Sequence, residues 1–70
     1  MSKIELTPRE KEVLVALVKG LDNKAIAKEL NVTHHTIKAH LSSILQKFGC
    51  KNRTDTALYA IRHGIIRLPD

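Results

Sequence analysis

The sequence is poor in the features that mark secreted, membrane-spanning and metal-binding proteins. Cys50 is its only cysteine, so no disulfide can form within the chain, which fits a reducing compartment. No apolar stretch approaches the roughly 20 residues that a membrane-spanning helix needs. The N-terminal segment MSKIELT has no apolar region of the signal-peptide kind. We therefore expect a cytoplasmic protein with no membrane partner.

Motifs for catalysis or metal binding are also missing. The chain has no CxxC or HExxH spacing and no paired carboxylates in a catalytic pattern. The histidines do not form a metal-binding pattern either. His35 and His40 are five residues apart, so they do not lie one above the other on a helix, as metal ligands four residues apart would. We expect no enzymatic activity, no metal ion and no cofactor, and we interpret Cys50 as a small core residue.

Basic charge is present, and it is unevenly distributed. The formal net charge is +5, yet residues 1–30 are nearly balanced, with six Lys or Arg against five Asp or Glu. Residues 31–53 contain four Lys or Arg, three His and no acid. A polyanionic partner is one explanation, and a solvated basic surface without a ligand is the other.

Capping residues and hydrophobic spacing predict helices and no strands. Hydrophobic residue types make up 43% of the 70 residues, which suffices for one small core in a single domain. Thr7 and Glu10 have the spacing of a capping box, and Asp22, Thr33 and Asn52 can cap three further helices. The prediction is an all-α, compact four-helix domain over residues 1–70, with helices at about residues 8–19, 23–30, 34–48 and 53–63.

The apolar positions of these helices are assigned to the core. The clearest stripe lies in the third helix and consists of Ile37, Leu41, Ile44, Leu45 and Phe48. In the fourth helix Leu58 and Ile61 are expected to face inward, and Ile65 and Ile66 to fold back onto the core. The short second helix, a tight connection and the longer capped third helix have the pattern of a helix-turn-helix.

The outward face of the third helix suits the major groove of DNA. At about 100° per residue, His35, Ala39 and Ser42 lie opposite the apolar stripe, and Lys38 and Ser43 lie on the flanks. Small side chains allow a close approach to base edges, polar groups can hydrogen-bond to them, and no acid repels the backbone. We predict base contacts by His35, Lys38, Ala39 and Ser42. The alternative is a solvated face that contacts nothing.

Phosphate contacts are predicted beside this face. Asn23 and Lys24 begin the second helix, where free backbone N–H groups attract phosphate. The first helix of a helix-turn-helix normally crosses the DNA backbone. Lys51 and Arg53, in the loop after the third helix, are further predicted contacts, although a solvated charge explains either one equally well.

The fourth helix suggests a contact between proteins. Its outward positions are expected to be Thr56, Tyr59, Ala60 and His63, which are mostly small or weakly polar. Small residues let a partner helix approach closely, and Tyr is enriched at interfaces. We predict that these four residues form a homodimer contact on DNA. The alternative from another class of function is a protein-interaction bundle that binds no DNA.

Four segments, in this order, resemble one known family. They are LTPREKEVL at 6–14, the segment 20–30, TIKAHLSSILQKFG at 36–49 and NRTDTALYAIRHGII at 52–66. Together they resemble the LuxR-type helix-turn-helix domain, in its NarL/FixJ response-regulator branch, over about residues 4–66. The resemblance implies a four-helix domain that binds double-stranded DNA and regulates transcription, usually as a homodimer joined through the fourth helix.

The resemblance also assigns roles to residues of the third helix. In this family the positions matching Lys38, Ala39 and Ser42 face the major groove, and those matching Thr36 and His40 meet the DNA backbone, as do those matching Asn23 and Lys24. Thr33, the cap of the third helix, is predicted to contact phosphate with them. Full-length members of the branch have a receiver domain before this one. Nothing of a receiver is present in these 70 residues, so we expect an effector domain alone. A contact with RNA polymerase, and an origin in a quorum-sensing-type LuxR regulator, stay open.

Overall fold

The computed structural model describes residues 4–67, which form four α-helices and no strand. The helices are α1 (Pro8–Val18), α2 (Asn23–Leu30), α3 (His34–Phe48) and α4 (Arg53–Arg62). Each bound agrees with the predicted one to within a single residue, so the all-α prediction is confirmed. Within the described range every helix is too short or too polar to span a membrane.

Side-chain caps begin all four helices, as the sequence predicted. The capping box of α1 is complete, because Thr7 Oγ1 accepts the Glu10 N–H at 3.1 Å and Glu10 Oε1 accepts the Thr7 N–H at 2.9 Å. Asp22, Thr33 and Asn52 each accept a hydrogen bond from the backbone N–H three residues later, at 2.8, 3.1 and 2.8 Å. These local bonds satisfy N–H groups that a helix start leaves unpaired, and they fix where each helix begins.

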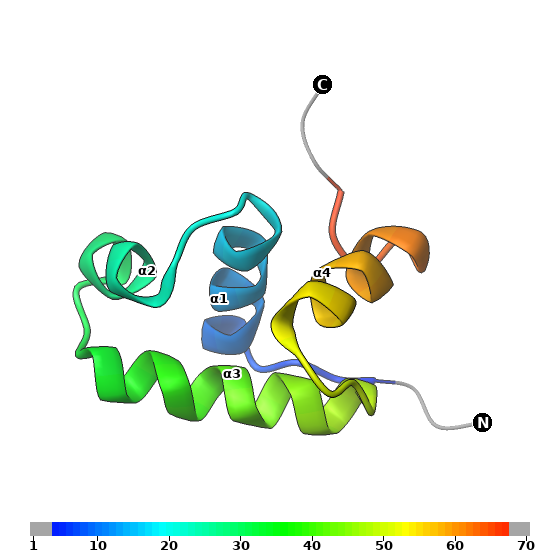
Figure 1. Cartoon of the computed structure of the whole chain (residues 1–70), viewed down its shortest axis with the longest axis horizontal. Coiled ribbons are helices and arrows are strands. Elements are labelled where there is room, and N and C mark those ends of the chain that lie inside the picture. Colours follow the sequence, from blue (N-terminus) through cyan, green and yellow to red (C-terminus); the bar gives the residue numbers. More distant parts are fainter. Residues whose placement is uncertain (1–3, 68–70) are drawn as a thin grey trace.

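The third helix is the base on which the other helices pack. Figure 1 shows α3 along one side of the molecule, and it contacts α1, α2 and α4. Its predicted apolar stripe is buried at Ile37, Leu41, Ile44 and Phe48, while Leu45 is partly buried. The rest of the buried core comes from all three other helices and from Ile66, which folds back as expected: Val13, Leu14, Ala16, Leu17, Ile26, Ala27, Ala60 and Ile66.

A tight turn sets α3 against α2. Asn31 adopts the left-handed conformation, with φ 57° and ψ 47°, which Asn tolerates better than most residues. The Val32 N–H then donates to Ala27 O at 3.0 Å, and the Val32 side chain packs partly on the core. The turn is therefore fixed to the end of α2 by a backbone bond, and α2 and α3 pack against each other through apolar residues.

The face that α4 turns inward differs from the prediction. Thr56 and Ala60 are completely buried, whereas Leu58 and Ile61, which were expected inside, are 45% and 44% exposed. Thr56 can be buried because its hydroxyl donates to Asn52 O at 2.9 Å. Small residues on the inner face let the α4 backbone lie close to α1 and α3. The predictions that Thr56 and Ala60 face outward and that Leu58 and Ile61 face inward are wrong.

The two other residues of the predicted dimer contact lie at the edge of the core. The centroid of the Tyr59 ring is 5.0 Å from that of the Phe48 ring. Tyr59 also stacks on His63, with 4.1 Å between the ring centroids. Tyr59 is partly buried and His63 is exposed.

Cys50 is also partly buried and packs against the core, in keeping with its interpretation as a core residue.

Candidate nucleic-acid interface

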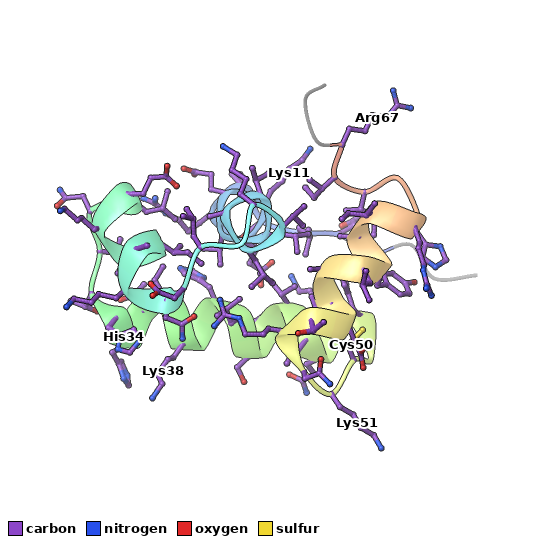
Figure 2. All side chains as sticks on the ribbon, turned by 45° about the horizontal axis from the view of Figure 1, so that its top comes forward. Lys11, His34, Lys38, Cys50, Lys51 and Arg67 are labelled. Carbon is purple, nitrogen blue, oxygen red and sulfur yellow. The ribbon has the colours of Figure 1, made fainter. Side chains whose placement is uncertain are left out.

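The predicted base-contacting residues share one exposed face of α3. His35, Lys38, Ala39 and Ser42 are all exposed, opposite the buried stripe. In Figure 2 the side chains of His34, Lys38 and Lys51 point away from the body of the molecule on the α3 side, while Lys11 and Arg67 lie on the opposite side. A capped, well-packed helix thus presents a small-residue surface flanked by cations, which is the shape that a major groove admits.

Two polar residues of α3 face α1 instead. Ser43 Oγ donates to Glu10 Oε2 at 2.6 Å, and Lys47 Nζ donates to Glu10 Oε1 at 2.6 Å and to Glu5 O at 3.0 Å. Ser43 therefore does not flank the outward face as expected. The charge of Lys47, which is counted in the basic segment 31–53, is directed at a protein carboxylate.

The Glu10 carboxylate is the centre of this contact, and it is only 4% exposed. Burial by itself would raise its pKa. The hydrogen bonds from Lys47, Ser43 and the Thr7 backbone, together with the Lys47 charge, outweigh burial and lower the pKa from 4.5 to about 2. Glu10 is therefore ionised at neutral pH and holds α3 against the start of α1.

The N-terminus of α3 presents hydrogen-bond donors. Thr33 Oγ1 accepts the Thr36 N–H and lies 2.9 Å from Thr36 Oγ1. Since one hydroxyl donates to the other, one hydroxyl proton of the pair stays available for a ligand. The first turn of α3 contains no acid. This helix start is suited to an anion such as phosphate.

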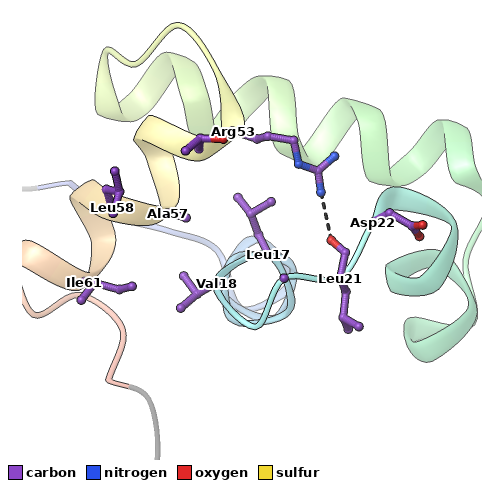
Figure 3. Close-up of a pocket in the computed structure, with 10 residues that line it drawn as sticks. Leu17, Val18, Leu21, Asp22, Arg53, Ala57, Leu58 and Ile61 are labelled. Atoms are coloured by element: carbon purple, nitrogen blue, oxygen red, sulfur yellow. Dashed lines mark hydrogen bonds between the residues drawn. The ribbon is translucent and has the colours of Figure 1, made fainter.

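Arg53 connects the starts of two helices. Its Nη1 donates to Asn23 Oδ1 at 2.6 Å, and its Nη2 donates to Leu21 O at 3.0 Å. Figure 3 shows the guanidinium reaching the Leu21 carbonyl across the end of α1. Arg53 and Asn23 are partly buried, while Lys24, the next residue of α2, is exposed. Arg53 is therefore not the free surface cation that its predicted phosphate contact assumed.

A groove of about 460 Å³ joins three of the predicted contact elements. It is lined by Asn23 of α2, by Lys38 and Ser42 of α3, and by Asn52 and Arg53 at the start of α4, beside Leu41 and Leu45. Lys51 is exposed in the loop between α3 and α4, and His40 is partly buried on α3.

Among residues 4–67 no cluster of His, Cys, Asp and Glu is arranged to hold a metal ion.

A second groove lies between α1 and α4, and Arg53 lines it as well as the first groove. Its volume is about 430 Å³, and Leu17 and Val18 of α1 face Ala57, Leu58 and Ile61 of α4 across it (Figure 3). This surface was not predicted from the sequence, because Leu58 and Ile61 of α4 were expected to lie in the core. The sequence signal available was the spacing of small Thr56 and Ala60, four residues apart on one face of the helix.

Comparison with known proteins identifies the class to which this helix-turn-helix domain belongs. Residues 5–60 match the family described as "GerE: Bacterial regulatory proteins, luxR family". The chain therefore belongs to the luxR family of bacterial regulatory proteins, which confirms the resemblance seen in the sequence.

Particular relatives include two regulators and one solved structure. The chain is 45% identical over 62 residues to the transcriptional regulatory protein LnrK of Bacillus subtilis and 40% identical to the response regulator protein VraR of Staphylococcus aureus. Each match covers 89% of this chain but only 28% and 30% of those proteins. The Vibrio cholerae VqmA structure superposes with a TM-score of 0.86 at 27% identity, over 89% of this chain and 28% of that one. This chain therefore spans less than a third of the length of these relatives.

Proposed function

We propose that this domain binds double-stranded DNA and is the output domain of a transcriptional regulator, with α3 in the major groove. The observation that carries the proposal is the exposed, acid-free face of α3, whose opposite side is buried against the other three helices. A helix that is anchored in this way can meet base edges in one fixed orientation. The luxR family to which the chain belongs consists of bacterial regulatory proteins, which supports the proposal.

The roles follow from exposure and chemistry. Lys38 can reach guanine acceptors, Ser42 can donate to or accept from a base edge, and Ala39 can contact a thymine methyl. His35, at the exposed start of the same face, completes the proposed base contacts. The proposed phosphate contacts surround this face on α2, α3 and the following loop, and they are Asn23, Lys24, Thr33, Thr36, His40 and Lys51.

The names of the relatives favour a two-component context. LnrK is described as a transcriptional regulatory protein and VraR as a response regulator, and both are more similar in sequence to this chain than the LuxR-type receptor VqmA is. We infer that this chain is the effector part of a response regulator rather than of a receptor of the VqmA kind. Since its target would be chromosomal DNA, the proposed location is the cytoplasm. A contact with RNA polymerase stays a prediction.

A second copy of the chain is the proposed protein partner. Leu58 and Ile61 leave much of their apolar surface exposed on α4, and Tyr59 and His63 border Leu58 in a neighbouring hollow. The VqmA structure is described as a dimer. We therefore move the proposed dimer contact from Thr56 and Ala60 to Leu58 and Ile61, and keep Tyr59 and His63 at its edge.

The test is DNA binding as a function of salt and of sequence. Lys24→Ala should weaken binding to every duplex and reduce the slope of log affinity against log salt by about 0.9, as expected for one lost phosphate contact. Lys38→Ala should also change the preferred sequence in a selection from random duplexes. Lys11→Ala is the matched control, because Lys11 is an exposed cation on the far side (Figure 2) and should change neither quantity. Salt-independent binding, or equal effects of all three variants, would contradict the proposal.

A further inference from the structure

We propose that Arg53 is a positioning residue, which orients the side-chain amide of Asn23 so that its NH₂ group is presented to the DNA backbone. The inference rests on the proposed function and deepens it. It assigns Arg53 a role that acts through Asn23, in place of the direct phosphate contact that its charge alone suggested.

The chemistry of the two groups fixes the orientation of the Asn23 amide. A guanidinium can only donate hydrogen bonds. The 2.6 Å bond from Arg53 Nη1 therefore fixes the Asn23 amide with its oxygen toward Arg53 and its nitrogen directed away. Without this bond the amide can rotate about its terminal torsion, whose preference is broad. Asn23 Nδ2 accordingly offers two donors, and residues 4–67 provide it with no hydrogen-bond partner.

Asn23 lies close to the proposed base-contacting residues. It is the first residue of α2, directly after the cap Asp22. It lines the same groove as Lys38 and Ser42, the proposed base-contacting residues of α3. A strand of DNA whose bases meet α3 would pass its phosphates along this groove, where a neutral amide donor can bind an oxygen.

Arg53 also joins the starts of α2 and α4. In the described part of the chain α2 and α4 do not pack against each other, whereas each packs on α1 and on α3. Arg53 is the first residue of α4. Its Nη2 donates a second hydrogen bond, of 3.0 Å, to the carbonyl oxygen of Leu21, the residue just before the α2 cap. One partly buried side chain therefore sets the start of α2 relative to α4.

Positioning and direct contact predict different salt dependence. A cation that neutralises a phosphate releases a counterion, so its removal lowers the salt slope by about 0.9. Asn23 is neutral, and a lost hydrogen bond from it weakens binding without altering the slope. If Arg53 acts through Asn23, its removal should also leave the slope unchanged, and removing both side chains should cost no more than removing Arg53.

The experiment measures fluorescence anisotropy of a labelled mixed-sequence duplex of about two helical turns, titrated with the wild-type domain and five variants at salt concentrations from about 50 to 200 mM. Asn23→Ala and Arg53→Ala should each weaken binding by about five-fold, which is the change in the dissociation constant expected for the loss of one hydrogen bond. The double variant should match Arg53→Ala, and both single variants should keep the wild-type slope. Lys24→Ala is the matched control and should lower the slope by about 0.9.

Several results would overturn the inference. A slope lowered in Arg53→Ala would assign that residue to a phosphate, and additive losses in the double variant would show that Arg53 and Asn23 act independently. Arg53→Lys covers the case in which Arg53→Ala does not fold. It keeps the charge but cannot reproduce the fork of two donors, so it should bind more weakly than wild type, and wild-type affinity would contradict the inference.

A readout without DNA completes the test. The side-chain NH₂ resonances of Asn23 in the free domain should shift in Arg53→Lys, while the corresponding resonances of Asn31, which lies outside this contact, should not. Unmoved Asn23 resonances would show that the amide does not depend on Arg53. A wild-type domain that fails to bind DNA at the lowest salt would instead overturn the proposed function itself.

Discussion

Replacement of Glu10 by glutamine tests the contact that holds α3 against the start of α1. Glutamine keeps the size of the side chain and removes the charge that Lys47 and Ser43 bind. A carboxyl pKa lowered from 4.5 to about 2 corresponds to about 3 kcal/mol of stability at neutral pH. Because the Lys47 side chain is 35% exposed, water screens part of its attraction to the Glu10 carboxylate. We therefore expect Glu10→Gln to lower the free energy of unfolding by about 2 kcal/mol. A domain of this size has only about 4–10 kcal/mol in total.

The lowered pKa of Glu10 predicts how the stability difference between wild type and Glu10→Gln changes with pH. The folded-state pKa lies below the unfolded value of 4.5, so the contribution of Glu10 is complete above pH 4.5 and is lost as the pH falls to about 2. The stability difference between wild type and Glu10→Gln should therefore be constant near neutral pH. It should shrink steadily below pH 4.5 as the wild-type carboxylate takes up a proton.

Urea unfolding followed by circular dichroism, at a series of pH values, measures this difference. Glu12→Gln is the control, because Glu12 is an exposed carboxylate of the same helix that lies 3.7 Å from Arg9. Exposed pairs of this kind contribute little, and we expect a change within about 0.5 kcal/mol. The reasoning is refuted if the two variants lose equal stability, or if the loss in Glu10→Gln does not change between pH 5 and pH 2.

Three further predictions concern stability and can be checked by the same unfolding assay. Ile37→Ala removes a fully buried side chain at the centre of the core and should cost about 2–5 kcal/mol. Thr56→Val keeps the shape of a buried residue but removes its bond to Asn52 O, so it should cost about 1 kcal/mol, whereas an outward Thr56 would tolerate the change. Asn31→Gly should be neutral or slightly stabilising and Asn31→Ala destabilising by about 1 kcal/mol, because the residue has a φ of 57°; equal effects would contradict the turn geometry.

The sequence was sufficient for features that depend on nearby residues. The helix starts were predicted because each cap and the backbone N–H that it accepts are three residues apart. The exposed face of α3 was predicted because its buried stripe is regular, and exposure at Lys38, Ala39 and Ser42 follows from that stripe. The family match confirms the resemblance that these segments carried.

The sequence was not sufficient where distant residues meet. In α4 the usual rule that large apolar residues lie inside failed, because the close approach of the helix required Thr56 and Ala60 there and left Leu58 and Ile61 exposed. The partners of Lys47 and Arg53 are 37 and 30 residues away. Nothing in their local sequence separates such bound cations from an exposed cation such as Lys51, so a count of charged residues overstates the positive charge that the surface offers to a ligand.

The buried stripe and the exposed face of α3 belong to the same fifteen residues. Ile37, Leu41 and Ile44 are committed to the core, whereas Lys38 and Ser42 can change at little cost in stability, since substitutions at exposed sites usually alter it by less than about 0.5 kcal/mol. If α3 reads base edges as proposed, a duplicated gene can therefore acquire a new DNA preference while it inherits the fold unchanged. Under that proposal, the tight turn after α2 would hold α3 of each descendant at the same angle to its DNA.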